Sequence, residues 1–187
     1  MKPVVNVTAM SDSAWATLNN AECLYTAAEV SAAIHTLAAA IRQDYADRNP
    51  LVITVMNGGM IFAGQLLPLL NFPLECDYLH ASRYGQALQG NALKWIAMPQ
   101  ADVHDRHILL LDDILDEGHT LAAIKQRLLA MGAASVACAV LSNKRIPKPK
   151  PITADYIGLD LPDRYVFGCG MDVAGAWRNL PAIYAIT

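Results

Sequence analysis

The chain has 187 residues, a net charge of −3 and a pI near 5.9. This composition excludes the basic surface typical of nucleic-acid-binding domains. A hydrophobic fraction of 54% with only 17% charged residues predicts a large core and leaves apolar surface for contacts between subunits. The most apolar stretch, 27–41, is shorter than a membrane span, and residues 1–10 do not resemble a secretion signal. We therefore expect a cytoplasmic globular enzyme with neither a membrane nor a nucleic-acid partner.

The four cysteines are far apart in the sequence. They are Cys23, Cys76, Cys138 and Cys169. No two of them form a CxxC pair, which excludes a zinc ribbon and a thioredoxin-type redox centre. We expect four reduced cysteines, as in most cytosolic proteins.

The first half of the chain alternates helix and strand signals. Thr26 and Glu29 form a capping box ahead of a helical apolar repeat that ends at Ile41. Residues 51–56 form an apolar run of strand length, which ends at an Asn-Gly-Gly sequence, and a second helix is predicted over 61–70.

The second half adds more strands than helices. Strands are predicted at 74–80, 93–98, 107–111, 135–141, 156–161 and 165–167, with an exposed loop between the first two. A helix is predicted over 120–131 because Gly132 is a favourable residue at a helix C-terminus. Residues 147–151, in which every second residue is proline, predict a stiff extended connector.

This order predicts an α/β fold, with a mainly parallel sheet flanked by helices and ligands at its carboxyl edge. We expect one domain over 1–187. Its core would run from about 26 to 145, and a small cap would form from about 1–25 and 146–187. Trp15 and Leu18 are expected to pack against this cap.

Carboxylates gather where the strand 107–111 ends. Asp112, Asp113 and Asp116 lie within five positions, and Glu117 follows them directly. Their mutual repulsion predicts a cation or a hydroxyl-rich ligand at this place. An acidic first helical turn with a purely structural role is the alternative.

A phosphate site is predicted directly after these acids. Glu117, Gly118, His119 and Thr120 lead into the helix 120–131, whose N-terminus offers N–H groups and a positive dipole end. The spacing is not that of a P-loop, and Gly168-Cys169-Gly170 lacks the third glycine of a dinucleotide site. Carboxylates for hydroxyl groups beside a phosphate nest predict a ribose-5-phosphate site.

Residues 109–120 resemble the phosphoribosyl diphosphate signature of type I phosphoribosyltransferases. The signature is an apolar strand, two acids, two apolar residues and Asp-x-Gly-x-Thr. Further segments are similar to the hypoxanthine-guanine branch of that family in the same order, so that the resemblance covers most of 50–187; they are 55–59, 82–85, 143–145, 163–168 and 178–181.

The resemblance implies the type I phosphoribosyltransferase fold and an activity in purine salvage. The 5-phosphoribosyl group of phosphoribosyl diphosphate would pass to hypoxanthine or guanine, which gives IMP or GMP and pyrophosphate. It also implies Mg²⁺ as cofactor and a homo-oligomer, either a dimer or a tetramer.

The resemblance assigns the sugar-phosphate roles residue by residue. Asp116 matches the catalytic acid/base, while Asp112 and Asp113 match the acids that hold the ribose hydroxyls, partly through Mg²⁺. The residues that match the 5′-phosphate site are Glu117, Gly118, His119 and Thr120. The family commonly has threonine where Glu117 stands, so we expect that carboxylate to point outward.

The base and pyrophosphate roles fall on residues that are far apart in the sequence. Lys144 matches the lysine that donates to the 6-oxo group, Tyr165 the aromatic that stacks on the base, and Val166 a backbone contact to it. Asp172 belongs to the same base-binding group and matches the second magnesium ligand. Arg178 matches the arginine that grips pyrophosphate.

The pyrophosphate loop departs from the family pattern. Asn57 and Gly58 match this loop, but the family usually has lysine, after a cis peptide bond, where Asn57 stands. Arg83 and Tyr84 match a mobile loop that usually reads Ser-Tyr. We expect Arg83 to restore the missing positive charge when the loop closes.

Two other functions stay open at this point. One is a regulator with the same fold that senses phosphoribosyl diphosphate or nucleotides. The other is a phosphoribosyltransferase that prefers xanthine, because contacts to the purine 2-position come largely from the backbone.

Overall fold

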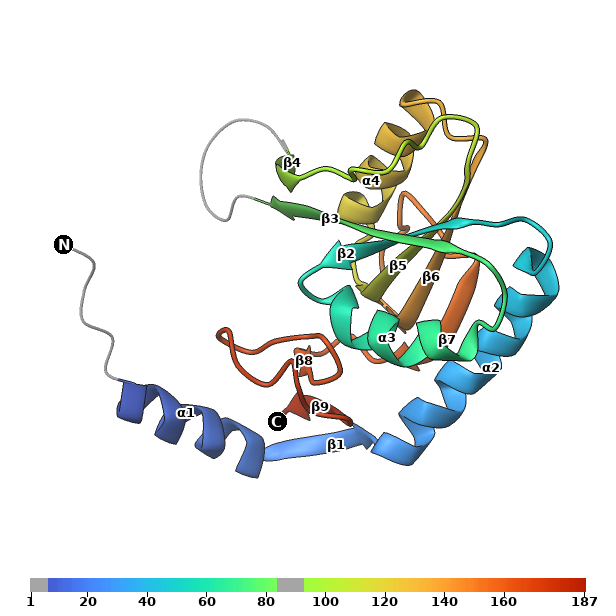
Figure 1. Cartoon of the computed structure of the whole chain (residues 1–187). Coiled ribbons are helices and arrows are strands. Elements are labelled where there is room, and N and C mark those ends of the chain that lie inside the picture. Colours follow the sequence, from blue (N-terminus) through green and yellow to red (C-terminus); the bar gives the residue numbers. More distant parts are fainter. Residues whose placement is uncertain (1–6, 84–92) are drawn as a thin grey trace.

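The protein is described by a computed structural model that covers residues 7–83 and 93–187, with side chains for 11–82 and 93–187. A six-stranded sheet with strand order β4-β3-β2-β5-β6-β7 forms its centre (Figure 1). The strands are β2 (Leu51–Met56), β3 (Glu75–Arg83), β4 (Leu93–Ala97), β5 (His107–Leu115), β6 (Ser135–Lys144) and β7 (Tyr156–Leu161). All neighbours are parallel except β3 and β4. This confirms the predicted α/β class.

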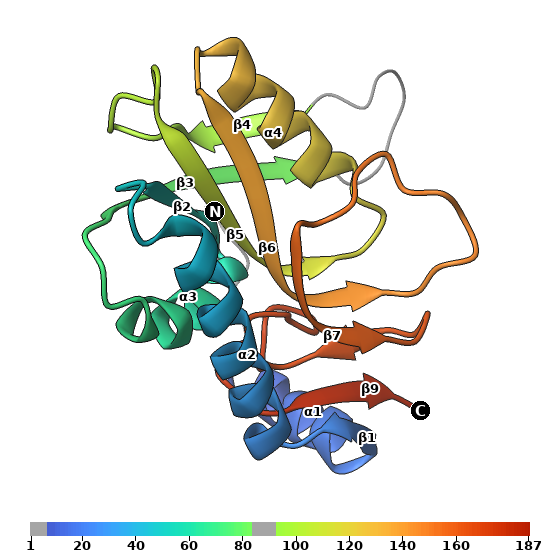
Figure 2. The same ribbon diagram turned by 90° about the vertical axis from the view of Figure 1, so that its right-hand side faces the viewer.

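Helices cover both faces of the sheet, which explains the continuous apolar runs in β2 and β5. The helices α2 (Ala27–Tyr45) and α3 (Gly59–Leu66), with a short 3₁₀ turn at Leu67–Leu69, pack on one face. Helix α4 (His119–Ala130) packs on the other face (Figure 2). The predicted capping box is confirmed, because Thr26 N–H donates to Glu29 at 2.8 Å while the Thr26 hydroxyl accepts from Glu29 N–H.

A second, smaller sheet joins the two ends of the chain. Its antiparallel order is β1-β9-β8, from β1 (Ala21–Tyr25), β8 (Val166–Phe167) and β9 (Ile183–Ile186). Helix α1 (Val7–Asn19) precedes β1, and Trp15 packs edge-on against Trp177 with ring centroids 4.9 Å apart. Packing of Trp15 against the C-terminal segment is thus confirmed.

Two of the differences from the elements expected from sequence bear on the site. Strand β5 does not end at Leu111 but runs to Leu115, because Asp112, Ile114 and Leu115 continue the ladder with β6. Asp112 and Asp113 therefore lie in a strand, and the acidic turn begins only at Asp116. Residues 156–161, expected in the cap, form β7 of the large sheet instead, because they pair with β6.

Within the described ranges, none of the helices combines the length and hydropathy that crossing a membrane requires.

Candidate active site

Two adjoining cavities lie at the carboxyl edge of the large sheet. The larger measures about 450 Å³ and is lined by the ends of β2, β3 and β5 and by the segment that enters α4. The smaller measures about 280 Å³ and lies between the end of β6 and the C-terminal segment. Both cavities are lined by Asp113, Ile114, Asp116 and Arg178. The carboxyl edge of a parallel sheet is where such folds bind ligands.

The acid pair, Asp112 and Asp113, lines the larger cavity from inside β5. The Asp113 N–H donates to Asp112 Oδ1 at 3.0 Å, and the Ser142 hydroxyl donates to the Asp113 carbonyl at 2.9 Å. Burial raises the pKa of both carboxyls, and the negative charge of Asp113 raises the pKa of Asp112 further. A cation or several hydroxyl groups in this cavity would stabilise the charged forms.

The turn after β2, strand β5 and the C-terminal segment meet closely at Asp113, and the first and last of these contribute glycines there. A Cβ atom on Gly58 would lie 2.2 Å from Asp113 Oδ2, and one on Gly170 would lie 2.3 Å from the Gly58 carbonyl oxygen. Gly170 also has φ +107°, which side chains rarely allow. The peptide bond between Met56 and Asn57 is cis, as the resemblance implied. The turn after β2 is thus wedged between the acid pair and the C-terminal segment.

The segment predicted to bind phosphate, residues 116–120 (the phosphate loop), links β5 to α4. Gly118 adopts φ +82° as the residue before the helix, and Thr120 lies in its first turn. The backbone from Glu117 to Thr120 lines the larger cavity at the positive end of the helix dipole. Glu117 is exposed and also lines the larger cavity, so the outward orientation of its carboxylate stays a prediction.

A close ion pair spans the boundary between the cavities. Lys144 Nζ, at the end of β6, lies 2.7 Å from Asp116 Oδ2, just beyond the end of β5. Tyr165 also lines the smaller cavity and is 56% exposed, and Val166 follows it in β8. An ammonium donor, a carboxylate acceptor and an exposed aromatic ring around one cavity suit a planar polar heterocycle.

Arg178 lines both cavities and is held by the C-terminal segment. Its guanidinium donates to the Gly170 carbonyl at 2.7 Å and to Oδ1 of Asp172. The other oxygen of Asp172 accepts from Gly175 N–H at 2.8 Å. Both carboxylate oxygens of Asp172 therefore accept hydrogen bonds from protein groups in this structure, and each keeps a lone pair for a further partner.

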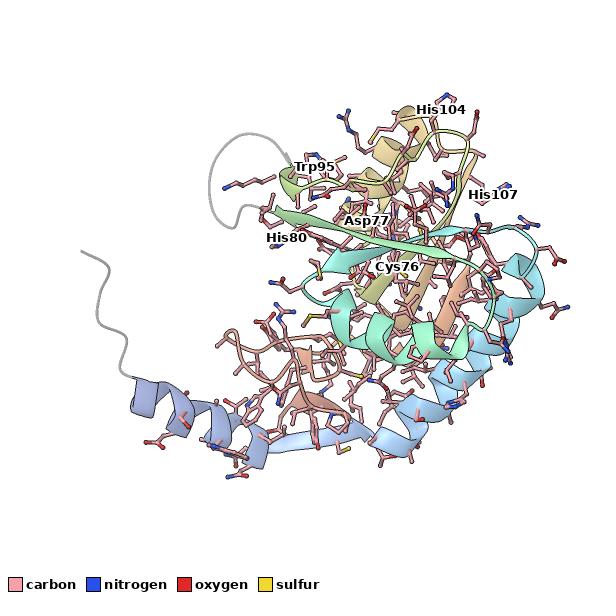
Figure 3. The ribbon with its side chains drawn as sticks, viewed as in Figure 1. Cys76, Asp77, His80, Trp95, His104 and His107 are labelled. Atoms are coloured by element: carbon pink, nitrogen blue, oxygen red, sulfur yellow. The ribbon has the colours of Figure 1, made fainter. Side chains whose placement is uncertain are left out.

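The structure also brings residues to the site that the sequence analysis did not select. His80 and Ser82 line the larger cavity from β3, and Met56 pairs with His80 across the parallel ladder. Figure 3 shows His80 on β3. Their position at the carboxyl end of a parallel strand was the available signal. Gly170 was noted only as part of a rejected dinucleotide pattern.

Two predicted features are not described by the structure. The side chain of Arg83, the last residue of β3, and the whole of Tyr84 lie outside the described residues. Among the residues whose side chains are described, no group of three or more His, Cys, Asp or Glu residues is arranged to hold a metal ion.

Comparison with known proteins gives one consistent family. The family described as "Phosphoribosyl transferase domain" matches residues 20–174. The hypoxanthine-guanine-xanthine phosphoribosyltransferase of Tritrichomonas foetus is 33% identical over 161 residues, which are 86% of this chain and 88% of that protein.

A longer relative and a solved structure agree with this match. The bifunctional protein TilS/HprT of Listeria innocua is 34% identical over 83% of this chain, which spans only 24% of that protein. A solved hypoxanthine-guanine-xanthine phosphoribosyltransferase superimposes with a TM-score of 0.82 at 31% identity, over 90% of this chain and 99% of that one.

Proposed function

Since the chain belongs to the phosphoribosyltransferase family, we propose that it transfers the 5-phosphoribosyl group of phosphoribosyl diphosphate to hypoxanthine and guanine. The products are IMP or GMP and pyrophosphate, and the activity belongs to purine salvage. The observation that carries the proposal is the Lys144–Asp116 pair, which lies between a sugar-phosphate cavity and a base cavity. No comparison favours the regulator considered above.

The larger cavity would hold the sugar and its phosphate groups. The acid pair would accept hydrogen bonds from the ribose hydroxyls, and the N–H groups at the start of α4 would bind the 5′-phosphate. Arg178 would bind the diphosphate leaving group, whose negative charge grows as the glycosidic bond breaks. Asn57 would contribute its backbone N–H but no positive charge, so less charge faces the diphosphate than in members that have lysine there.

The smaller cavity would hold the purine. The base enters between Asp116 and Lys144, and this exchanges their ion pair for contacts to the ligand. Lys144 then donates to the 6-oxo oxygen, while Asp116 accepts the proton carried by the five-membered ring as the unprotonated nitrogen of that ring forms the bond to the anomeric carbon. Adenine carries an amino donor at position 6, which would face the ammonium donor unpaired. Tyr165 covers the ring face.

Magnesium fits the donor set of the larger cavity. Asp112 and Asp113 supply hard oxygen ligands in a buried place, where burial raises the pKa of each. Two carboxylates suffice, because Mg²⁺ keeps several waters and shares its coordination with substrate phosphates. When bound, the ion neutralises charge on the diphosphate.

Direct assay tests the proposal. Purified protein is incubated with phosphoribosyl diphosphate, Mg²⁺ and, separately, hypoxanthine, guanine, xanthine or adenine, and nucleotide formation is followed by absorbance. We expect turnover with hypoxanthine and guanine, none with adenine, and loss of activity with a chelator. Inactivity with every 6-oxopurine contradicts the proposal. A preference for xanthine would revise the base specificity alone.

The remaining properties are proposals that need their own measurements. We propose a homo-oligomer, which sedimentation would reveal, and a cytoplasmic location. The compensation of Asn57 by Arg83 is tested by Arg83→Ser, which should raise the KM for phosphoribosyl diphosphate.

A further inference from the structure

The connector, residues 147–151, follows β6 and contributes one partly buried lysine, Lys150, which contacts the ends of β5 and β6. Lys150 stands between Pro149 and Pro151. Proline fixes φ and disfavours helix in the residue before it, so the connector is stiff. Contrary to the prediction from sequence, it is not extended throughout, because the chain bends at 147, 148 and 151. Lys150 is partly buried, whereas Lys148, two residues earlier, is exposed.

The Lys150 ammonium meets three oxygen acceptors. Nζ donates to the Leu115 carbonyl at 2.7 Å, to the Lys144 carbonyl at 2.6 Å and to Asn143 Oδ1 at 2.8 Å. An ammonium has three N–H donors and no acceptor, so all of its bonds are used. Burial lowers the pKa of Lys150.

These acceptors lie next to the two residues of the ion pair. Leu115 immediately precedes Asp116, and Leu115 pairs with Asn143 where β5 and β6 end. The Lys144 carbonyl belongs to the residue whose ammonium lies 2.7 Å from Asp116. Lys150 thus bridges the ends of β5 and β6 through main-chain and amide oxygens, while the side chains of Lys144 and Asp116 form the ion pair.

The connector also supports the phosphate loop. A Cβ atom on Gly118 would lie 3.1 Å from Ile152 and 3.5 Å from Pro151, so this glycine packs directly on the residues after Lys150. The Asn143 amide donates in turn to Asp160 at 2.9 Å, which fixes the orientation of its oxygen toward Lys150.

We propose that Lys150 is a positioning residue that holds the Lys144 backbone at a fixed distance from Asp116 and so sets the geometry of purine binding. The proposal rests on the function proposed above. Lys150 is not proposed as a catalytic residue, because all three N–H groups of its ammonium already donate to protein oxygens. Its removal would let the end of β6 move relative to β5, and the base cavity would lose its shape before the sugar-phosphate cavity does.

The test is Lys150→Met, which keeps the length of the side chain and removes the ammonium. We expect the KM for hypoxanthine to rise about tenfold, because losing these charged hydrogen bonds lets the Lys144 backbone shift at the base site. The KM for phosphoribosyl diphosphate should change by less than about twofold, because the phosphate loop packs on Pro151 and Ile152, which this substitution retains. Lys148→Met in the same connector is the matched control and should match the wild type in both.

Thermal unfolding shows whether each variant is folded, and a second variant then separates positioning from stability. Lys150→Arg keeps the charge, but its planar guanidinium cannot serve three acceptors from one nitrogen, so a smaller rise in the same KM is expected. If Lys150→Met does not fold, the Arg variant decides by the same comparison. An active wild type with an unchanged hypoxanthine KM in the variants, or an equal loss for both substrates, overturns the positioning role. An inactive wild type contradicts the proposed function instead.

Discussion

The two cavities are built in different ways although they share a wall. The larger is lined mostly by runs of consecutive residues, 55–58, 80–82 and 112–121. The smaller takes single residues or pairs from distant places, such as Lys144, Tyr165 and Arg178. The runs of the larger cavity are held in place by the turn after β2, the end of β3 and the start of α4. A site made of dispersed residues depends on how the C-terminal segment packs on the sheet, and variants should therefore affect the two cavities differently.

The largest effect is expected at Asp116, which lines both cavities. Asp116→Asn should lower kcat with hypoxanthine by about a hundredfold to ten-thousandfold, the usual contribution of a general acid/base. Binding of phosphoribosyl diphosphate with Mg²⁺, measured by calorimetry, should be largely retained. Asp47→Asn, at an exposed position after α2, is the control. Retained turnover in Asp116→Asn would remove this residue from the chemistry.

The second-largest loss of activity is expected at Gly58, where the turn after β2 lies directly against Asp113. Gly58→Ala places a methyl group 2.2 Å from Asp113 Oδ2, so the turn after β2 must shift. We expect kcat/KM for phosphoribosyl diphosphate to fall about a hundredfold, as for an ångström-scale misplacement of a binding group.

Gly64→Ala in α3 is the matched control for that substitution. Its Cβ would meet nothing within 4 Å. Alanine should also stabilise the helix by about 1 kcal/mol. Equal activity of the two variants would show that the close approach at Gly58 has no bearing on catalysis.

The base cavity alone is tested by Lys144→Met. Losing a charged donor to the 6-oxo group should raise the KM for hypoxanthine about tenfold and narrow the margin over adenine. The KM for phosphoribosyl diphosphate should change little. Arg145→Met removes an adjacent exposed cation that pairs with Asp160, and it should leave both constants near the wild type. A rise in both KM values for Lys144→Met would mean that the cavities are not separable.

The smallest expected effect is on the pH dependence of stability. It is tested with one buried cysteine in the large sheet and one in the C-terminal segment. Burial raises the pKa of Cys138 in β6 to about 12 and also raises the pKa of Cys169. Because each folded-state pKa exceeds that of the unfolded thiol, the stabilisation is complete below about pH 8.5 and is lost as pH rises toward the folded value.

Thermal unfolding between pH 8 and pH 10.5 measures this loss. The unfolding temperature should fall less steeply with pH in Cys138→Ala than in the wild type, while Cys169→Ala should show a smaller difference. Cys23→Ala, at an exposed position, should keep the wild-type slope. An identical slope in all four proteins would contradict a role for the buried thiols.

The sequence by itself determined the phosphate loop, the parallel sheet and the helix that begins after the Thr26 capping box. The loop and the helix each follow from a pattern in neighbouring residues, and the sheet follows from the order of strands and helices along the chain. The resemblance to the family added the separate residues of the base cavity to this prediction. The end of β5 escaped prediction because two carboxylates in an apolar strand imitate a turn; only the ladder with β6 keeps them extended.

Tertiary structure alone decided the contacts between distant segments. No local pattern links Gly58 with Gly170, Lys150 with the two strand ends, or β1 with β9. A hydrogen bond or close approach of this kind becomes favourable only after the sheet has formed and buried its apolar faces, so its information lies in the packing of the whole chain rather than in any one stretch of it.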